Sequence, residues 1–148
     1  MATLPIIKYP NKSLRRKSEK VKDVLDPEIQ KLVKDMIATM KKNNGLGLAA
    51  PQVKKSLRLC VIEESGTVYV FVNPKITSTS RKRVIAEEGC LSFPGKFIPI
   101  RRPEKIKVRY LDEKGIKSKL KAEGILARAI QHEIDHLDGI LMIDRIRD

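Results

Sequence analysis

The sequence has no tryptophan, only three tyrosines and three phenylalanines, and two cysteines among its 148 residues. So few aromatic side chains disfavour the stacking platforms on which single-stranded nucleic acids bind. Two cysteines cannot form a secreted disulfide framework, and they indicate a reducing compartment. The N-terminal apolar stretch, Leu4 to Ile7, contains Pro5 and is followed at once by charge, so we expect neither a signal peptide nor a membrane span. A cytoplasmic location follows.

Basic residues outnumber acidic ones, 31 to 18, which gives a net charge of +13. This charge attracts polyanions and opposes self-association, so we expect a monomer with a possible nucleic-acid-rich partner. The length and the 41% apolar content predict one domain spanning residues 1–148. The basic runs Arg81–Arg83 and Lys117–Lys121 are most simply a solvated face and a loop, with contact to an anionic partner as the alternative.

Two segments have the periodicity of amphipathic helices. The first begins with Asp26 as N-cap and Pro27 at the first helical position, and it ends at Asn43 to Gly45. Its apolar residues recur at helical spacing: Ile29, Leu32, Val33, Met36, Ile37 and Met40. The second runs from about Glu123 to Leu137 and stops at Gly139, with Leu126, Ala129, Ile130 and Ile134 on its apolar side.

Strand patterns lie between the two helices, after an extended basic lead-in over residues 1–24. Leu57 to Ile62 and Thr67 to Val72 form a hairpin through Ser65-Gly66. Lys105 to Leu111 alternates polar and apolar residues, and Ile116 to Lys121 returns after a turn. The sequence therefore predicts an α+β fold, in which antiparallel strands pack around the C-terminal helix and an N-terminal amphipathic helix precedes them.

The C-terminal helix contains the pattern HExxH, in the segment Gln131 to His136. His132 and His136 are four residues apart, so both imidazoles lie on one helical face about one turn apart and can chelate a divalent metal. Glu133 follows the first histidine, where its carboxylate can take a proton from water at the metal. An amphipathic helix with two surface histidines is the alternative, but these are the only histidines in the chain.

A hydrolytic metal generally needs three protein ligands and one open position. Cys90, between Gly89 and Leu91, is the candidate for the third ligand, since Cys60 lies in an apolar run typical of a buried, inert thiol. Gly89 permits close backbone approach, and the Leu91 N–H can point toward whatever the metal binds. A structural role for Cys90 is the alternative.

A third segment, Gly45 to Gln52, reads GLGLAAPQ. Its small residues let another backbone lie close, and it lacks the Lys-Ser/Thr ending of a phosphate loop. A helix C-cap and connector is the simplest interpretation. The sharper one makes the amide of Gln52 a donor to a developing oxyanion.

These three segments together resemble the signature of peptide deformylases, the enzymes that remove the N-formyl group from nascent bacterial polypeptides. GLGLAAPQ, EGCLS and QHEIDHLDG occur in the family's order and approximate spacing. The opening stretch from Ile6 to Pro10 and through Leu14-Arg15 is also similar, so the resemblance covers about Pro5 to Ile143.

The resemblance implies a role for each matching position. Cys90, His132 and His136 become the metal ligands, Glu133 the acid and base, and Gln52 with the Leu91 N–H the oxyanion donors. A formylmethionyl peptide would lie along Gly45, Leu46, Gly47 and Gly89, with its methionine side chain near Ile125, Arg128 and Ala129. Hydrolysis would release formate, and Asp135 and Glu88 would orient the ligands or be surface acids.

Several alternatives stay open at this point. The ligand set accepts ferrous iron, zinc, nickel or cobalt, and the family favours iron in the cell. A protease that cuts internal peptide bonds would share the HExxH helix without needing Cys90 and Gln52. A basic ribosome- or RNA-binding module would need a fourth structural ligand, for which only Cys60 remains. Many relatives continue into a further C-terminal helix, so ribosome docking here would depend on the positive charge.

Overall fold

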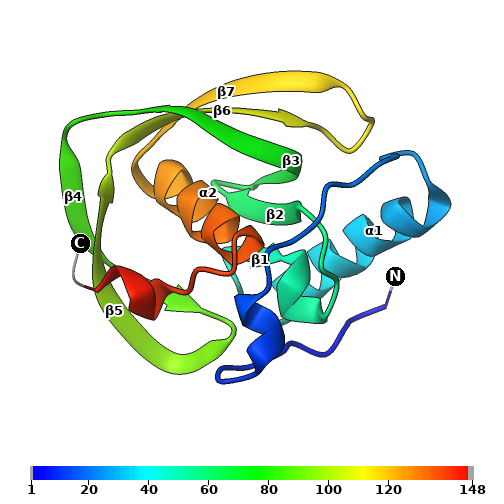
Figure 1. Cartoon of the computed structure of the whole chain (residues 1–148), viewed down its shortest axis with the longest axis horizontal. Coiled ribbons are helices and arrows are strands. Elements are labelled where there is room, and N and C mark those ends of the chain that lie inside the picture. The colour runs from blue at the N-terminus through cyan, green and yellow to red at the C-terminus, as the bar shows by residue number, and fades with distance from the viewer. Residues whose placement is uncertain (1, 147–148) are drawn as a thin grey trace.

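The computed structural model describes residues 2–146 (Figure 1). Its helices are α1 (Pro27–Lys42) and α2 (Gly124–Leu137), with 3-10 turns at Lys12–Arg15, Ala50–Val53 and Met142–Arg145. The strands are β1 (Gly47–Ala49), β2 (Leu59–Glu64), β3 (Thr67–Thr79), β4 (Arg83–Cys90), β5 (Phe93–Pro103), β6 (Lys105–Leu111) and β7 (Lys117–Glu123). The predicted α+β class and both predicted helices are confirmed. Within the described residues, neither helix is long and apolar enough to cross a membrane.

The strands form two antiparallel sheets. The larger has the order β1-β2-β3-β6-β7, and β4 pairs with β5 in a separate two-stranded sheet. The β2–β3 hairpin turns through Ser65 and Gly66, both with positive φ, as the sequence predicts. In β6 the predicted alternation holds, because Ile106 and Val108 are buried, whereas Lys105, Lys107 and Arg109 are exposed.

The two helices pack on opposite faces of the five-stranded sheet. α1 brings Met36 and Met40 against one face, in a core that includes Val61 and Val72. α2 covers the other face, where Ile130 and Leu137 share a second core with residues such as Phe71. Figure 1 shows α2 between this sheet and the β4–β5 sheet. Its position makes α2 the element that both sheets surround.

Local interactions fix the two ends of α2. Gly124, with φ of 62°, turns the chain from β7 into the helix. At the other end, Arg58 donates to the carbonyl of Leu137 at 3.1 Å and pairs with Asp138 at 2.9 Å, a position where cations are favoured. A Cβ on Gly139 would lie 2.3 Å from the carbonyl oxygen of Arg15, so only glycine permits this close approach. The histidine-bearing helix is therefore held firmly at its C-terminus.

Lys117–Lys121 lies in β7, as the predicted return strand requires, and its lysines form an exposed face. Other segments differ from the sequence prediction. The N-terminal lead-in contains a 3-10 turn that buries Leu14 completely. β5 was not predicted, because Pro94, Pro99 and Pro103 interrupt its pattern, and such prolines are tolerated only where backbone N–H groups need no partner.

Candidate metal centre and active site

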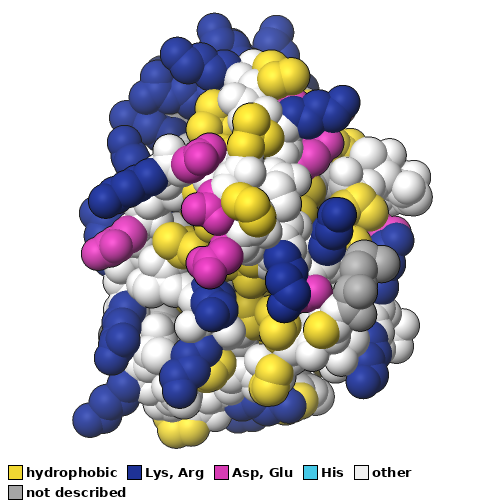
Figure 2. All heavy atoms as spheres, turned by 90° about the vertical axis from the view of Figure 1, so that its right-hand side faces the viewer, with side chains coloured by type: hydrophobic (Ala, Val, Ile, Leu, Met, Phe, Trp, Pro, Cys, Tyr) yellow, Lys and Arg dark blue, Asp and Glu magenta, His cyan; other side chains and the backbone are white. Residues whose placement is uncertain are grey.

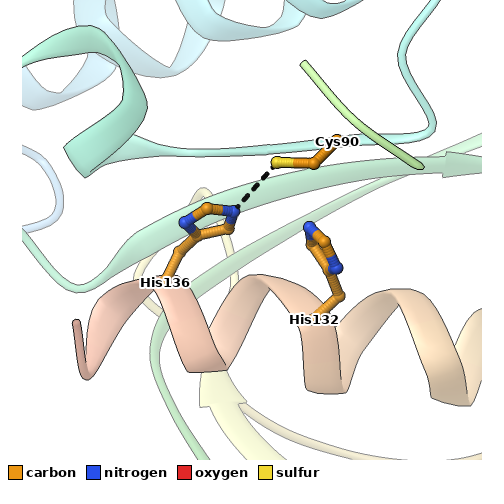
Figure 3. Close-up of side chains that lie close together, drawn as sticks. All are labelled: Cys90, His132 and His136. Carbon is orange, nitrogen blue, oxygen red and sulfur yellow. Dashed lines mark hydrogen bonds between the residues drawn. The ribbon is translucent and has the colours of Figure 1, made fainter. Parts of the chain in front are cut away.

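The two histidines of the pattern lie one turn apart on α2, and both are buried. Their ring centroids are 5.0 Å apart. In Figure 3 both rings rise from α2 toward Cys90, which approaches from the end of β4. The helix thus presents the pair toward a residue that is more than forty positions away in sequence.

Cys90 completes a compact group with these histidines. Its Sγ lies 3.3 Å from Nε2 of His136 (Figure 3), and one potential ligand atom from each residue falls within 4.8 Å of the others. A tetrahedral site with metal–sulfur and metal–nitrogen bonds of roughly 2.3 and 2.0 Å requires a sulfur–nitrogen separation of about 3.5 Å. The donor set and its spacing therefore fit a divalent metal. Cys60 is outside this group and fully buried in the α2 core.

Hydrogen bonding sets the orientation of His132. Its Nδ1 lies 2.9 Å from Oε1 of Glu88, which leaves Nε2 as the ring nitrogen for the Cys90 side of the site. Arg102 holds the same carboxylate through two hydrogen bonds, of 2.5 and 2.9 Å. Burial opposes ionisation of Glu88, but the bonds from His132 and Arg102 outweigh it and lower the pKa to about 2. Glu88 is therefore an anion that orients a ligand.

Arg102 connects this carboxylate to a second one. Its remaining amino group donates to Asp135 at 2.9 Å, and Asp135 also receives hydrogen bonds from Arg145. The Asp135 side chain thus supports Arg102 rather than a candidate ligand. Glu88 also accepts from Arg128 at 2.7 Å. The result is a buried network of alternating charge behind the histidines.

The protonation of the histidines reflects these neighbours. Burial lowers the pKa of His136, and the charge of His132 lowers it further. For His132, burial is outweighed by hydrogen bonds to Cys90 and Glu88, which raise its pKa well above the usual value. Cys90 and Glu88 thus favour a positive charge at His132, and a divalent cation placed between the same groups would be favoured for the same reason.

Glu133 lies beside the cluster with one carboxylate oxygen unpaired. It is 4% exposed, and its Oε1 is buried without a hydrogen-bond partner in the described structure. Burial raises its pKa to about 7, partly countered by the charge of His132. Its Oε2 lies 2.6 Å from where a Cβ on Gly47 would be, so the glycine of β1 makes room for the carboxylate. An unpaired buried carboxylate of this kind needs an external partner.

Gln52 faces the cluster from the turn that follows β1. Its Oε1 accepts from the Ala49 N–H at 2.9 Å, which fixes the amide so that Nε2 points toward Cys90. Nε2 lies 3.5 Å from the Cys90 Sγ and donates to Ser92 at 3.1 Å. Ser92 in turn donates to the Ile7 carbonyl at 2.7 Å. The amide is thus an oriented donor at the cluster rather than part of a simple connector.

A cleft of about 1120 Å³ opens onto the cluster. It is lined by nearly all the site residues that the sequence predicts: Gly45, Leu46, Gly47, Gln52, Gly89, Cys90, Leu91, Ile125, Arg128, Ala129, His132 and Glu133. His136 is absent from this lining and lies behind it, 1% exposed. The guanidinium of Arg128 bonds the Val84 and Ile100 carbonyls, so its terminal group braces the cleft wall. The structure therefore gathers the predicted residues around one cavity.

Sequence inspection missed Arg102 and Ser92. The sequence does contain a signal for Arg102, because Ile98, Ile100 and Arg102 alternate with other residues and so point to the same face of β5. An arginine on an apolar strand face is expected to be buried and paired with an acid. Ser92 carries no comparable signal, since its partners come from segments that are distant in sequence.

An HExxH helix enclosed by antiparallel sheets, with a thiol, two imidazoles and a buried carboxylate at one cleft, defines the class: a hydrolase with a possible metal site. The comparisons with known proteins name the family. The family model described as polypeptide deformylase matches residues 3–148. The chain therefore belongs to the polypeptide deformylase family, and it is an enzyme of that family.

Individual relatives match over almost their full length. The peptide deformylase of Clostridium botulinum is 48% identical, with 98% of this chain and 97% of the relative covered. The peptide deformylase of Thermodesulfovibrio yellowstonii is 46% identical, with 99% of this chain and 90% of the relative covered. The crystal structure from Thermotoga maritima has a TM-score of 0.96 at 39% identity, with 99% of each chain covered. A structure from Ehrlichia chaffeensis, in complex with actinonin, has a TM-score of 0.94 at 45% identity, covering 98% and 89%.

Proposed function

We propose that this enzyme removes the N-formyl group from the formylmethionine of nascent polypeptides and releases formate. The observation that carries the proposal is the group of Cys90, His132 and His136 with Gln52 at its edge. A protease with an HExxH helix has no need of this thiol and amide, whereas the family does. The geometry thus favours attack on a small terminal amide over cleavage within a chain.

Cys90, His132 and His136 would hold one divalent metal, ferrous iron in the cell and zinc, nickel or cobalt after purification. When bound in such a three-ligand site, the metal supplies Lewis acidity, which polarises a carbonyl and lowers the pKa of water. Glu88 keeps the His132 ring in place through its Nδ1, and second partners of this kind raise metal affinity.

Glu133 would move the proton. Its buried, unpaired Oε1 accepts a proton from the attacking water, and the oxygen of that water bonds to the formyl carbon. Glu133 then returns the proton to the departing amine as the carbon–nitrogen bond breaks. The products are formate and a peptide with a free N-terminus. Gly47 is required because any side chain there would occupy the place of the carboxylate.

Gln52 and Leu91 would stabilise the oxyanion that forms on the substrate. The Gln52 amide is held by Ala49 and Ser92, so it can donate without reorganisation. Leu91 lies in the turn between β4 and β5, directly after Cys90, and its backbone N–H is proposed as the second donor. One oriented donor of this type contributes on the order of 10²- to 10³-fold in turnover.

The cleft would hold the peptide in an extended conformation. Its backbone would lie along Gly45, Leu46, Gly47 and Gly89, and the methionine side chain would contact Ile125, Arg128 and Ala129. At Gly89 a Cβ would lie 2.9 Å from the Phe97 ring, so the absence of a side chain lets this ring pack against β4 beside the cleft. The enzyme would act as a monomer of one domain in the cytoplasm. It would dock on the ribosome through its basic surface.

The test compares two substrates on the metal-loaded enzyme. A formyl-Met peptide should yield one formate and one new amine per turnover, whereas the same peptide without its formyl group should remain intact. A protease would cleave inside both peptides, and a non-enzymatic binding module would cleave neither. Either of those results would overturn the proposal.

A further inference from the structure

A strip of basic side chains crosses three strands of the larger sheet without an acid opposite. In register, Arg109 of β6 faces Lys75 of β3 on one side and Lys119 of β7 on the other. Lys107 likewise faces Lys121. We call these five residues the basic strip. Neighbouring strands are about 4.8 Å apart, and along one strand two residues that point to the same face are about 6.7 Å apart. All five charges therefore lie within a Debye length of a neighbour and repel one another.

The strip occupies the sheet face that α1 only partly covers. Over β2 and β3 this face is apolar, and Val61 and Val72 pack in the core beneath α1. Leu111, opposite Val72, is the last β6 residue in that core, and the strip begins at the next position of the same face, Arg109. Beyond the reach of α1, the face thus changes from apolar to basic.

The basic strip is open to solvent and has no internal counter-charge. All five side chains are exposed, and within residues 2–146 none forms an ion pair. An ion pair does occur at the strip's end, where Lys105 meets Glu123 at 3.7 Å. Figure 2 shows Lys and Arg side chains gathered at the top of the molecule, where Figure 1 places β6 and β7. Like charges held opposite one another cost stability, so a ligand that neutralises them binds favourably.

We infer that the basic strip binds the phosphate backbone of duplex RNA. A duplex presents regularly spaced phosphates, and a row of lysines and arginines can neutralise several at once. Aromatic stacking for a single strand is absent from the strip, because Tyr110 points into the α2 core. Stable anchoring on an anionic membrane uses an inserted apolar face beside the charge, but Val108 and Leu120, which lie between the lysines, pack on the α2 side.

The inference extends the ribosome contact proposed above, since it names both the surface and the partner chemistry. It rests on the proposed function in one respect, which is that ribosomal RNA would be the source of the duplex in the cell. Binding is measured without turnover, so failure of one claim leaves the other open to its own test.

The experiment measures the anisotropy of a labelled RNA duplex of about 16 base pairs, titrated with the full chain at several salt concentrations. The test variant combines Lys107→Gln, Lys119→Gln and Lys121→Gln. The control combines Lys12→Gln, Lys17→Gln and Lys55→Gln, which removes the same charge from exposed positions outside β3, β6 and β7. A third variant replaces Lys107, Lys119 and Lys121 by arginine and so keeps the charge.

Removing three phosphate contacts should reduce the salt slope by about 2 to 3 and weaken binding at 0.1 M salt on the order of 10²-fold. The control and the arginine variant should bind like the wild type. Equal weakening in test variant and control would overturn the inference in favour of net charge alone. Stronger strip-dependent binding to phosphatidylserine vesicles, or no duplex binding at low salt, would also overturn it. Retained formate release shows that each variant is folded.

Discussion

Replacing Arg102 by methionine removes the guanidinium that holds Glu88 behind His132, and it keeps an unbranched side chain of comparable reach. Arg102 is 4% exposed and makes two hydrogen bonds to Glu88 and one to Asp135. Its loss leaves two buried carboxylates without their shared cation. Arg128 still pairs with Glu88, and Arg145 with Asp135, but each carboxylate loses its most buried cation. The substitution should therefore destabilise both the fold and the ligand arrangement.

The size of the effect follows from burial. Breaking a buried ion pair by removing one partner costs about 3–5 kcal/mol, and the side chains of Arg102 and Glu88 are 5% and 4% exposed, so solvent screens them little. For a chain of this length that loss corresponds to a fall in Tm on the order of 10 °C. Metal affinity should fall about 10- to 100-fold, because His132 loses its fixed orientation.

Urea unfolding and competition with a chelator measure the two effects separately. Arg101→Met is the matched control, since Arg101 is the adjacent residue of β5 and is exposed. It should change unfolding free energy by less than about 0.5 kcal/mol and leave metal affinity unchanged. Arg102→Lys should recover part of the stability but not the paired geometry. The reasoning is refuted if Arg102→Met and Arg101→Met behave alike.

Two further predictions concern the cluster and its surroundings. Cys90→Ser should lose metal or activity. Cys60→Ala should mainly cost stability, because Cys60 is fully buried in the α2 core and lies outside the ligand group. Equal metal loss in both variants, measured by metal analysis, would contradict the three-ligand site. Gly47→Ala should displace the Glu133 carboxylate and reduce formate release at least tenfold with normal metal content. Gly45→Ala should reduce the rate less, because its nearest contact is the flexible end of the Leu91 side chain. A larger rate loss in Gly45→Ala than in Gly47→Ala would show that Gly47 does not make room for the carboxylate.

The helices and the β6–β7 hairpin could be predicted because each has its own periodicity and end signals. Asp26 caps α1 as expected, and its side chain accepts from the Glu28 N–H at 2.8 Å. The β4–β5 sheet is different. β5 carries three prolines, and in β4 the apolar face includes Glu88, whose burial depends on Arg102 from the partner strand. Such pairing is decided by tertiary contact and leaves little trace in a local pattern.

The same distinction applies to the site. His132 and His136 are linked by helical spacing, so their proximity is readable from the chain itself. Cys90 and Gln52 are brought to them by separate elements. The need for a third ligand already made Cys90 a candidate, whereas the resemblance to a family was needed to place Gln52 firmly beside the metal. Arg102 was missed because its partners, Glu88 and Asp135, lie on another strand and on α2.

Formate release by Glu133→Ala, at metal content matched to the wild type, tests the proposed chemistry most directly. Glu133 is not among the three candidate ligands, so the variant should bind metal at near-normal stoichiometry. Its turnover on a formyl-Met peptide should fall by about 10²- to 10⁴-fold, at or beyond the upper end because the carboxylate acts in both attack and amine release. Retention of more than about a tenth of wild-type turnover would contradict the assignment of Glu133 as the group that moves the proton.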